Sequence, residues 1–297
     1  MFIDDHVHTS SWSDLGWSPG AVGPATPEQL IDMYDEVGID KAVLLPFVSP
    51  ECNFLTQCNE EMLMIAEKYP DRFIPFCNID PRLCHNDPNM DLSFVINHYK
   101  DKGCKGIGEI TANLYFDDPR VINLFDHAEK CEMPVMLHIA TQDGGIYGLI
   151  DDFGLPRLEG QLKAHPNLTF MGHSQAFWAH MSGDVTHETW GGYPKGPVVE
   201  GGRIPELLKN YPNLVGDLSA GSGCNAVSRD PDFGYHFMEE FQDQLCFGTD
   251  ICRPENRHDM LVNLKRFMET GLSEKRLSQQ AFDKISHQNA IRVLKLS

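Results

Sequence analysis

The feature of this sequence that most constrains its fold is the regular alternation of short apolar runs with segments of helical period. The apolar runs have strand character and are 2–8, 40–47, 73–79, 104–110, 133–140, 167–173, 213–219 and 244–250. Between the first two lies 26–38, where Thr26 suits an N-cap, Pro27 the first helical position and Gly38 the end of a helix. Strands that alternate with helices in this way pair in parallel.

Eight such strands predict a closed (β/α)8 barrel, the TIM barrel. Segments 58–69 and 118–131 also have an apolar helical stripe. Proline ends three of the helices in similar joints, at residues 69–71, 165–167 and 211–213. No G-x-G-x-x-G motif follows the first strand, which argues against an open dinucleotide-binding sheet. We expect a single domain over 1–297, with a helical tail at about 274–296 packed outside the barrel.

Composition limits the partners and the compartment. Lys and Arg total 24 against 43 Asp and Glu, a formal charge of -19, and such a surface repels phosphate backbones, so we expect no nucleic-acid partner. The nine cysteines form no C-x-x-C pair, which favours a reducing cytoplasm over a disulfide framework or a thiolate zinc site. No run approaches the ~18 apolar residues of a membrane span. The sequence predicts a soluble, cytoplasmic protein with a small-molecule substrate and no membrane partner, and it leaves a homo-oligomer open.

Four connections after predicted strands are long and rich in Gly, Ser and Pro, namely 9–25, 48–57, 174–202 and 220–231. Barrel active sites are assembled on the loops that follow the carboxyl ends of the strands. All four tryptophans lie in two of these loops: Trp12, Trp17, Trp178 and Trp190. They either pack as a cap over the barrel mouth or line a substrate pocket.

Four histidines and one aspartate occupy positions from which side chains reach the barrel mouth. His6 and His8 are separated by one residue on a strand, so both point to the same face, into the barrel. An apolar barrel interior does not hold two adjacent imidazoles without a shared partner. His138, His173 and Asp250 each end a later strand. This convergence predicts a bound divalent metal, zinc first, with manganese, iron or cobalt as alternatives.

The same residues carry a family resemblance. D-x-H-x-H at Asp4, His6 and His8, the two later histidines and G-T-D at 248–250 resemble the amidohydrolase superfamily, and within it family 2, the branch of the aminocarboxymuconate-semialdehyde decarboxylase-like enzymes. Supporting motifs are N-I-D-P at 78–81, G-H-S at 172–174, P-N-L-V-G-D-L-S at 212–219 and N-A-I-R-V-L at 289–294. The resemblance spans the whole chain. It does not name a substrate, because this branch includes hydrolases of esters, lactones and amides as well as nonoxidative decarboxylases.

The resemblance also suggests residue roles. Glu109 ends the fourth strand, where relatives with two ions place a bridging carboxylate or carboxylated lysine; otherwise it is a buried carboxylate bonded to a neighbouring backbone or ligand. Asp250 is expected to accept the proton of metal-activated water and pass it to the leaving group. His173 or His138 can steady the oxyanion if only one of them stays on the metal. Asp4 either orients the first strand and its ligands or has a simple surface or cap role.

Other candidate substrate groups lie in the mouth loops. Arg229 and Arg253 can each bind a substrate carboxylate through two N–H donors, or they are simply solvated. His180 and His187 are either acid–base or ligand groups, or passive loop histidines. The candidate substrate-binding set is completed by Trp12, Trp178 and Trp190.

The leading hypothesis is a metal-dependent hydrolase that attacks a small amide, lactone or ester with metal-activated water. The runner-up is a nonoxidative decarboxylase of a small carboxylated substrate. Glu109 favours hydrolysis, because a second ion helps to make hydroxide and a decarboxylase has no need of it. Two further hypotheses are a catalytically inactive barrel that serves as a binding protein, which an intact ligand set disfavours, and a metal-dependent nuclease, which the charge of -19 disfavours.

Overall fold

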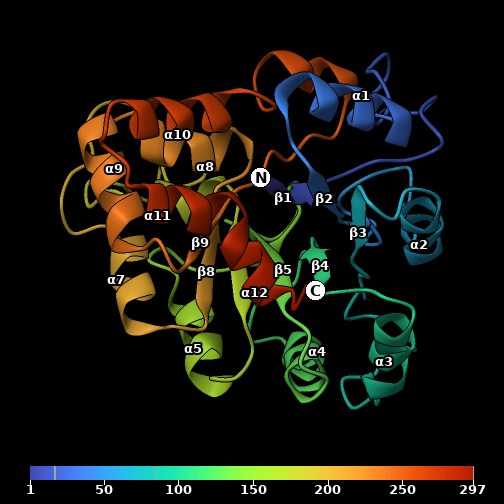
Figure 1. Cartoon of the computed structure of the whole chain (residues 1–297). Helices are drawn as coiled ribbons and strands as arrows, with labels where there is room; N and C mark the ends of the chain where they lie inside the picture. The colour runs from blue at the N-terminus through green and yellow to red at the C-terminus, as the bar shows by residue number, and fades with distance from the viewer. Residues whose placement is uncertain (17, 84, 297) are drawn as a thin grey trace.

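The computed structural model describes residues 1–16, 18–83 and 85–296, and in it parallel strands are surrounded by helices (Figure 1). Each of the eight predicted runs contains a strand: β1 (Ile3–Val7), β2 (Lys41–Leu44), β3 (Phe73–Pro75), β4 (Ile107–Ile110), β5 (Val135–Ala140), β7 (Phe170–His173), β8 (Leu214–Asp217) and β9 (Leu245–Cys246). A short strand that the sequence did not predict, β6 (Leu149–Ile150), pairs with β5.

The strands form two parallel sheets that meet at both edges. Their orders are β1-β2-β3 and β4-β5-β7-β8-β9. A parallel bridge joins Cys77, just after β3, to Ile107 of β4, and another joins Val7 of β1 to Ile251, just after β9. The strands therefore follow one another in sequence around a TIM barrel, as the alternation predicted.

The helices begin and end where local signals place them. They are α1 (Pro27–Val37), α2 (Asn59–Lys68), α3 (Ser93–Asp101), α4 (Pro119–Lys130), α5 (Pro156–Ala164), α6 (Gln175–Ala179), α7 (Arg203–Asn210), α8 (Ala220–Ser228), α9 (Pro231–Glu240), η1 (Pro254–His258), α10 (Asn263–Ser273), α11 (Gln279–Asp283), η2 (Lys284–Gln288) and α12 (Asn289–Val293). In α1 the Thr26 side chain accepts from Gln29 N, and Gly38 ends the helix in the left-handed region at φ 73°. Both caps agree with the sequence prediction.

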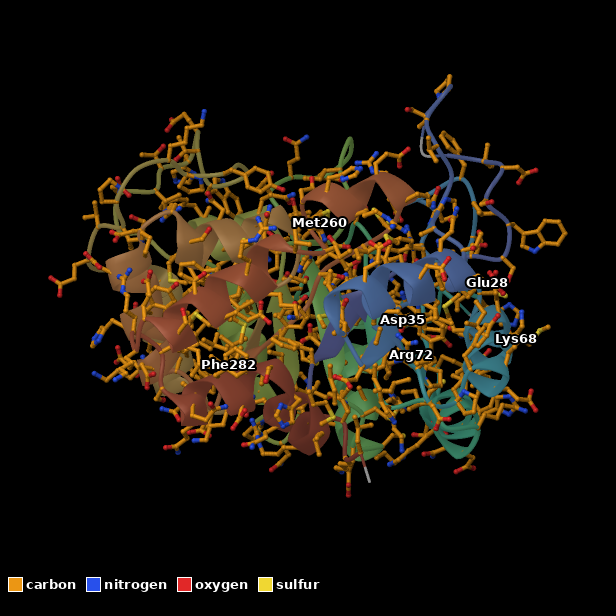
Figure 2. The ribbon with its side chains drawn as sticks, turned by 45° about the horizontal axis from the view of Figure 1, so that its top comes forward. Glu28, Asp35, Lys68, Arg72, Met260 and Phe282 are labelled. Carbon is orange, nitrogen blue, oxygen red and sulfur yellow. The ribbon has the colours of Figure 1, made fainter. Side chains whose placement is uncertain are left out.

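Packing, not surface charge, holds the outer helices. Figure 2 labels the ion pairs beside α1: Lys68 Nζ lies 2.8 Å from Glu28 Oε1, and Arg72 Nη1 lies 2.8 Å from Asp35 Oδ1. Exposed pairs of this kind contribute only about 0–1 kcal/mol each. The fully buried Leu30 of α1 belongs to the continuous apolar layer between strands and helices.

The C-terminal helix closes one end of the barrel. Ala290, Val293 and Leu294 pack against interior side chains near the starts of strands, such as Ile3 and Ile74. This end is opposite to the carboxyl ends of the strands, so α12 leaves the mouth with its polar side chains free. Among the described residues, no helix combines the length and the apolar character needed to cross a membrane.

One predicted loop is largely helical. Residues 220–231 were expected to be irregular because they are rich in Gly and Ser, but α8 occupies most of this segment. Its small residues allow close packing: a Cβ on Gly223 would lie 2.4 Å from the Leu218 carbonyl carbon. The composition that suggested a loop is therefore a packing requirement of a short helix beside β8.

Candidate metal centre

His6 of β1 and His8, which directly follows this strand, face one another inside the barrel. Their Nε2 atoms lie 3.0 Å apart. Nδ1 of His8 lies 2.8 Å from the Leu45 carbonyl, and Nδ1 of His6 lies 2.7 Å from Asp217 Oδ2. A carbonyl can only accept, so Nδ1 of His8 carries the hydrogen and its Nε2 presents a lone pair. The pairing register of β1 with β2 shifts between Asp4 and Val7, in the part of the strand that holds His6.

Glu109 lies between two sets of imidazole nitrogens. Its Oε2 is 3.6 Å from His6 Nε2 and 3.4 Å from His8 Nε2. Its other oxygen, Oε1, is 2.7 Å from His138 Nδ1 and 3.9 Å from His173 Nε2. The glutamate is almost fully buried at the end of β4. One carboxylate therefore lies between the histidines at the end of β1 on one side and those of β5 and β7 on the other.

Asp250 completes the cluster from the segment after β9. Its Oδ1 lies 3.5 Å from Nε2 of both His6 and His8, and its Oδ2 lies 3.8 Å from His173 Nε2. The Asp250 side chain is 22% exposed, whereas that of Glu109 is 3% exposed. Asp250 is therefore the carboxylate of this cluster that faces the open mouth.

The donor atoms fit a divalent cation. Lone pairs of imidazole nitrogens and carboxylate oxygens converge in a buried space, and like-signed atoms this close are stable only if a cation or extra protons lie among them. The cluster contains two sets of potential ligand atoms, and within each set the atoms lie within 4.8 Å of one another. One set is His6, Glu109 and His173, and the other is His6, His8 and Asp250. His138 is outside these two sets and contacts Glu109 directly.

The electrostatics of the cluster favour positive charge at its centre. Burial opposes ionisation of Glu109, but His6 and His138 outweigh it and hold the pKa of Glu109 well below its usual value. Burial likewise opposes the charged form of His6, yet Asp250, Asp217 and Glu109 raise its pKa well above the usual value. For Asp250 burial prevails over the attraction of His6 and His8 and raises the pKa to about 6. The carboxylates thus create a site that attracts a cation.

Asp4 supports the G-T-D turn and lies outside the ligand cluster. Its Oδ1 accepts from Thr249 N at 2.8 Å, and its Oδ2 accepts from Tyr34 OH at 2.6 Å and from the Thr249 hydroxyl. Asp4 is fully buried, and burial raises its pKa to about 6. Asp4 therefore ties β1 and α1 to the residue that precedes Asp250.

The sequence analysis did not single out several residues that contact the cluster. Asp217 contacts His6 and His173, the ring of Phe47 stacks on His8 at 3.8 Å, and the ring of Tyr147 lies 4.4 Å from His138. Asp217 carried a usable signal, since it is a carboxylate near the end of the predicted strand 213–219. Phe47 and Tyr147 gave none, because an aromatic residue near a strand end is common.

Two candidate substrate residues of the long segment after β7, Trp178 and His180, are buried in the protein interior. Trp178 is fully buried and its Nε1 donates to the Asp217 carbonyl at 2.7 Å. His180 is also buried; its Nδ1 lies 2.8 Å from the Ala176 carbonyl and its Nε2 accepts from Gly154 N at 3.0 Å. Both nitrogens of His180 are thereby used, and burial lowers its pKa. These contacts give Trp178 and His180 packing roles in place of the substrate contacts that the sequence suggested.

Of the other two candidates from this segment, Trp190 is in the interior and His187 is at the surface. Trp190 is buried and meets the rings of Phe153 and His180 edge to face, at 6.1 and 5.4 Å. His187 is exposed, with its ring 4.4 Å from that of Phe153. The structure therefore does not bring these two residues into the ligand cluster.

The two candidate arginines differ in their surroundings. Arg229 follows α8, and its Nη1 lies 3.5 Å from the Pro194 carbonyl. Within the described chain its Nε and Nη2 are buried without a hydrogen bond, and burial lowers its pKa. Arg253 is exposed at the start of η1, three residues after Asp250. Arg253 is thus the arginine nearer in sequence to the mouth residues.

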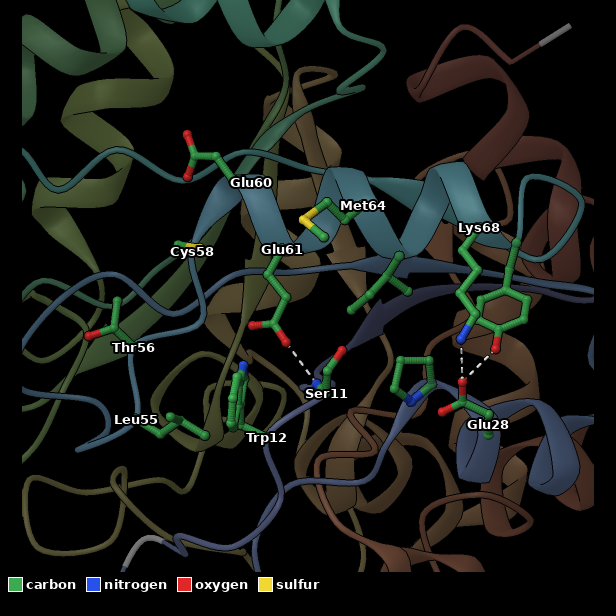
Figure 3. Close-up of a pocket in the computed structure, with 13 residues that line it drawn as sticks. Ser11, Trp12, Glu28, Leu55, Thr56, Cys58, Glu60, Glu61, Met64 and Lys68 are labelled. Carbon is green, nitrogen blue, oxygen red and sulfur yellow. Dashed lines mark hydrogen bonds and ion pairs between the residues drawn. The ribbon is translucent and has the colours of Figure 1, made fainter.

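Trp12 lies on the outer surface. It is 68% exposed and lines a groove of about 750 Å³ with residues of α2 such as Met64 (Figure 3). Glu61 of α2 holds the adjoining loop by accepting from Ser11 N at 2.7 Å. None of the metal-cluster residues lines this groove. The remaining tryptophan, Trp17, lies outside the described residues.

Comparisons with known structures find proteins with a similar barrel. The barrel resembles a probable 2-pyrone-4,6-dicarboxylic acid hydrolase from Acinetobacter baumannii, with citric acid bound, at TM-score 0.60 and 16% identity over 99% of each chain. It resembles 5-carboxyvanillate decarboxylase from Novosphingobium aromaticivorans, complexed with manganese and a nitrobenzoic acid, at TM-score 0.61 and 18% identity over 100% of this chain and 96% of the other. It also resembles 2,6-dihydroxybenzoate decarboxylase from Rhizobium at TM-score 0.58 and 15% identity, over 99% of this chain and 98% of that one.

At these identities the solved structures establish a shared TIM-barrel fold and leave the activity open. A search of curated protein sequences finds no significant match. The family model described as amidohydrolase matches residues 3–296, nearly the whole chain. The chain belongs to the amidohydrolase family, in the branch called family 2.

Proposed function

We propose that this amidohydrolase is a metal-dependent hydrolase of a small carbonyl substrate, an amide, lactone or ester. The observation that carries the proposal is the position of Glu109 between two sets of imidazoles, with Oε2 toward His6 and His8 and Oε1 toward His138 and His173. A carboxylate with donor nitrogens on both sides is suited to bridge two ions. His6, His8 and Asp250 would hold one ion, and Glu109 and His173 the other, with His138 beside Glu109.

Residues around the ion would supply the proton transfer and the charge stabilisation. A divalent ion bound there lowers the pKa of water toward ~7 and polarises a substrate carbonyl. Asp250 faces the mouth, so it would be placed to take a proton from water and return it to the leaving group. His173 lies beside Asp250, where it can stabilise the oxyanion if it is not a ligand. The burial of the cluster excludes bulk water from all but this side.

We propose zinc as the first choice of ion, because imidazole-rich ligation with carboxylates suits it, and manganese as the next, since manganese accompanies the Novosphingobium decarboxylase. Substrates are small molecules and not nucleic acids, given the charge of -19. None of the described cysteines forms a disulfide, which supports a reducing cytoplasm as the compartment.

The second candidate function is nonoxidative decarboxylation. It is favoured by the structural likeness to decarboxylases of 5-carboxyvanillate and 2,6-dihydroxybenzoate. In that reaction Asp250 would manage the proton that replaces carbon dioxide. Arg253 or Arg229 would bind the substrate carboxylate, since a carboxylate in an active site shielded from water needs a cationic partner. The two functions differ in the need for a second ion.

Metal content and product analysis together test the proposal. We expect apo protein reconstituted with excess zinc or manganese to bind close to two equivalents, and Glu109→Gln to lower this toward one. The reconstituted protein should release acid from lactones, esters or N-acyl compounds and no carbon dioxide from aromatic carboxylates. Binding of a single ion together with release of carbon dioxide would establish the decarboxylase instead. Turnover of neither class by fully loaded protein would favour the inactive binding barrel.

A further inference from the structure

One carboxylate oxygen outside the ligand sets contacts two of the proposed ligands at once. Asp217 Oδ2 lies 2.7 Å from Nδ1 of His6 and 3.0 Å from Nδ1 of His173. The same oxygen accepts from Ser219 Oγ at 2.7 Å. His6 comes from β1 and His173 from β7, so Asp217 of β8 joins ligands that lie far apart in the sequence.

We propose that Asp217 is a positioning residue that sets the tautomer of both histidines and thereby couples the filling of the two metal positions; this inference rests on the proposed metal-dependent function. A carboxylate accepts, so both Nδ1 atoms carry hydrogens and both Nε2 atoms present lone pairs. These Nε2 atoms face Glu109 and Asp250. An imidazole that donates to a carboxylate is also a more basic ligand.

Asp217 is itself fixed in place. Its Oδ1 accepts from Ser219 N at 2.8 Å, and its backbone carbonyl accepts from Trp178 Nε1 at 2.7 Å. The residue is fully buried. Burial opposes its ionisation, but His6 and His173 outweigh this and hold the pKa of Asp217 well below its usual value. A fixed carboxylate can orient two rings, whereas a mobile one would follow them.

The coupling follows from how the ligands are shared. His6 belongs to both sets of potential ligand atoms, and His173 belongs to one of them. The other two histidines have separate supports, since Nδ1 of His8 donates to the Leu45 carbonyl and His138 contacts Glu109. Loss of the Asp217 carboxylate therefore disturbs both positions, while donors remain at each.

Metal titration of Asp217→Asn tests the inference without any substrate. We expect both ions to bind 10–100-fold more weakly than in the wild type, the range typical for the loss of such a partner, measured with cobalt by its visible spectrum and by equilibrium dialysis. Asp151→Asn is the matched control, because Asp151 is also a buried carboxylate and its hydrogen bonds go to backbone N–H groups of residues 152, 157 and 158. That variant should bind both ions as the wild type does.

Tautomers give a second readout that a merely structural role would not change. In ¹⁵N-histidine spectra of the zinc-loaded wild type, His6 and His173 should both carry their hydrogen on Nδ1, and Asp217→Asn should lose this in at least one ring. Unchanged affinity for both ions in Asp217→Asn, or weakening of one ion alone, would overturn the coupling. If Asp217→Asn does not fold, the wild-type spectrum decides, since an Nε2–H tautomer at either residue refutes the inference. Absence of hydrolysis would defeat the proposed function but not these binding results.

Discussion

At the scale of single residues, the cluster depends on which ring nitrogen of each histidine faces Glu109 and Asp250. Strand-end histidines and Asp250 were expected at one mouth because the carboxyl ends of parallel strands meet there, and the structure brings them together. Which ring nitrogen faces inward depends on groups such as Asp217 and the Leu45 carbonyl, which come from other strands. The Leu45 carbonyl has no local signal, and the position of Asp217 near the end of a predicted strand does not show which histidines its carboxylate contacts. The sequence also could not show that Trp178 and His180 are buried, because their burial depends on how the long segment after β7 packs against the rest of the protein.

Asp250→Asn should separate catalysis from metal binding. The amide keeps the size of the carboxylate but cannot accept and return a proton, so we expect turnover to fall by at least ~10²-fold. The imidazoles and Glu109 remain, so the fold and most of the metal should be retained, as checked by circular dichroism and metal analysis. The double variant His6→Ala, His8→Ala is the contrasting case and should lose most of the metal. Wild-type turnover by Asp250→Asn would remove this residue from the mechanism.

Gly216→Ala should disturb the support of Asp217 through Trp178. An added Cβ at this β8 position would lie 2.8 Å from the Trp178 Cη2 atom and 3.1 Å from Leu245 Cδ2. Because the indole is held by its bond to the Asp217 carbonyl, we expect a loss of about 1–3 kcal/mol in the free energy of unfolding and a shift in tryptophan fluorescence.

Gly221→Ala is the control for that substitution. Gly221 lies on the exposed side of α8, and its added Cβ would lie 3.3 Å from a Tyr193 ring carbon. Alanine is favoured over glycine in helices by up to ~1 kcal/mol, so this variant should be as stable as the wild type or slightly more stable. Equal stability of Gly216→Ala and the wild type would contradict the close packing of Trp178 on β8.

At the scale of elements, the sequence located the strands and the capped helices because their signals are local. The proline joints also hold, since α2, α5 and α7 end at residues 68, 164 and 210, and the C-cap residue that follows each helix precedes a proline. The prediction failed for α8, whose Gly and Ser content looks like a loop, and for β6, which is too short to show alternation. Both are decided by packing against neighbouring strands, and that information lies in the tertiary structure.

The start of α5 should make folding stability depend on pH. Asp151 accepts from Arg157 N at 2.9 Å and Leu158 N at 2.8 Å, and burial raises its pKa from 3.8 to about 6. A carboxyl whose pKa is raised by folding stabilises the protein fully below pH ~4, and this contribution is lost as the pH rises through about 6. The advantage of the wild type over Asp151→Asn should thus shrink by about 2 kcal/mol between pH 4 and pH 7.

Urea unfolding of both proteins at the two pH values measures this difference. Asp152→Asn is the control, because Asp152 is exposed next to Asp151 and should give a pH profile close to that of the wild type. A constant difference between the wild type and Asp151→Asn would show that burial does not raise the pKa of this carboxyl.

At the scale of the whole molecule, barrel closure and the proposed metal centre lie at the same seam. Between β1 and the segment after β9, Asp250 N donates to His6 O at 2.8 Å and His8 N donates to Ile251 O at 2.9 Å. The proposed ligands His6 and His8 lie on one side of this seam, and the proposed ligand Asp250 lies on the other. The sequence predicted the strands and the ligands separately, but it gave no sign that the ligands span the closure.

Metal removal should therefore loosen the barrel at this seam first. An ion that binds only the folded state adds about 2.7 kcal/mol of stability at a free concentration of 100 Kd, so chelation should lower Tm, and re-addition of zinc or manganese should restore it. Hydrogen exchange at the amides of His8 and Asp250 should accelerate in the chelated protein. Amides between β5 and β7, which pair from Val135–Phe170 to His138–His173, should change much less. The double variant His6→Ala, His8→Ala should be insensitive to chelation. A chelator-induced drop in Tm with uniform acceleration around the barrel would mean that the ion stabilises the fold without closing it, and an unchanged Tm would remove the ion from the folding equilibrium altogether.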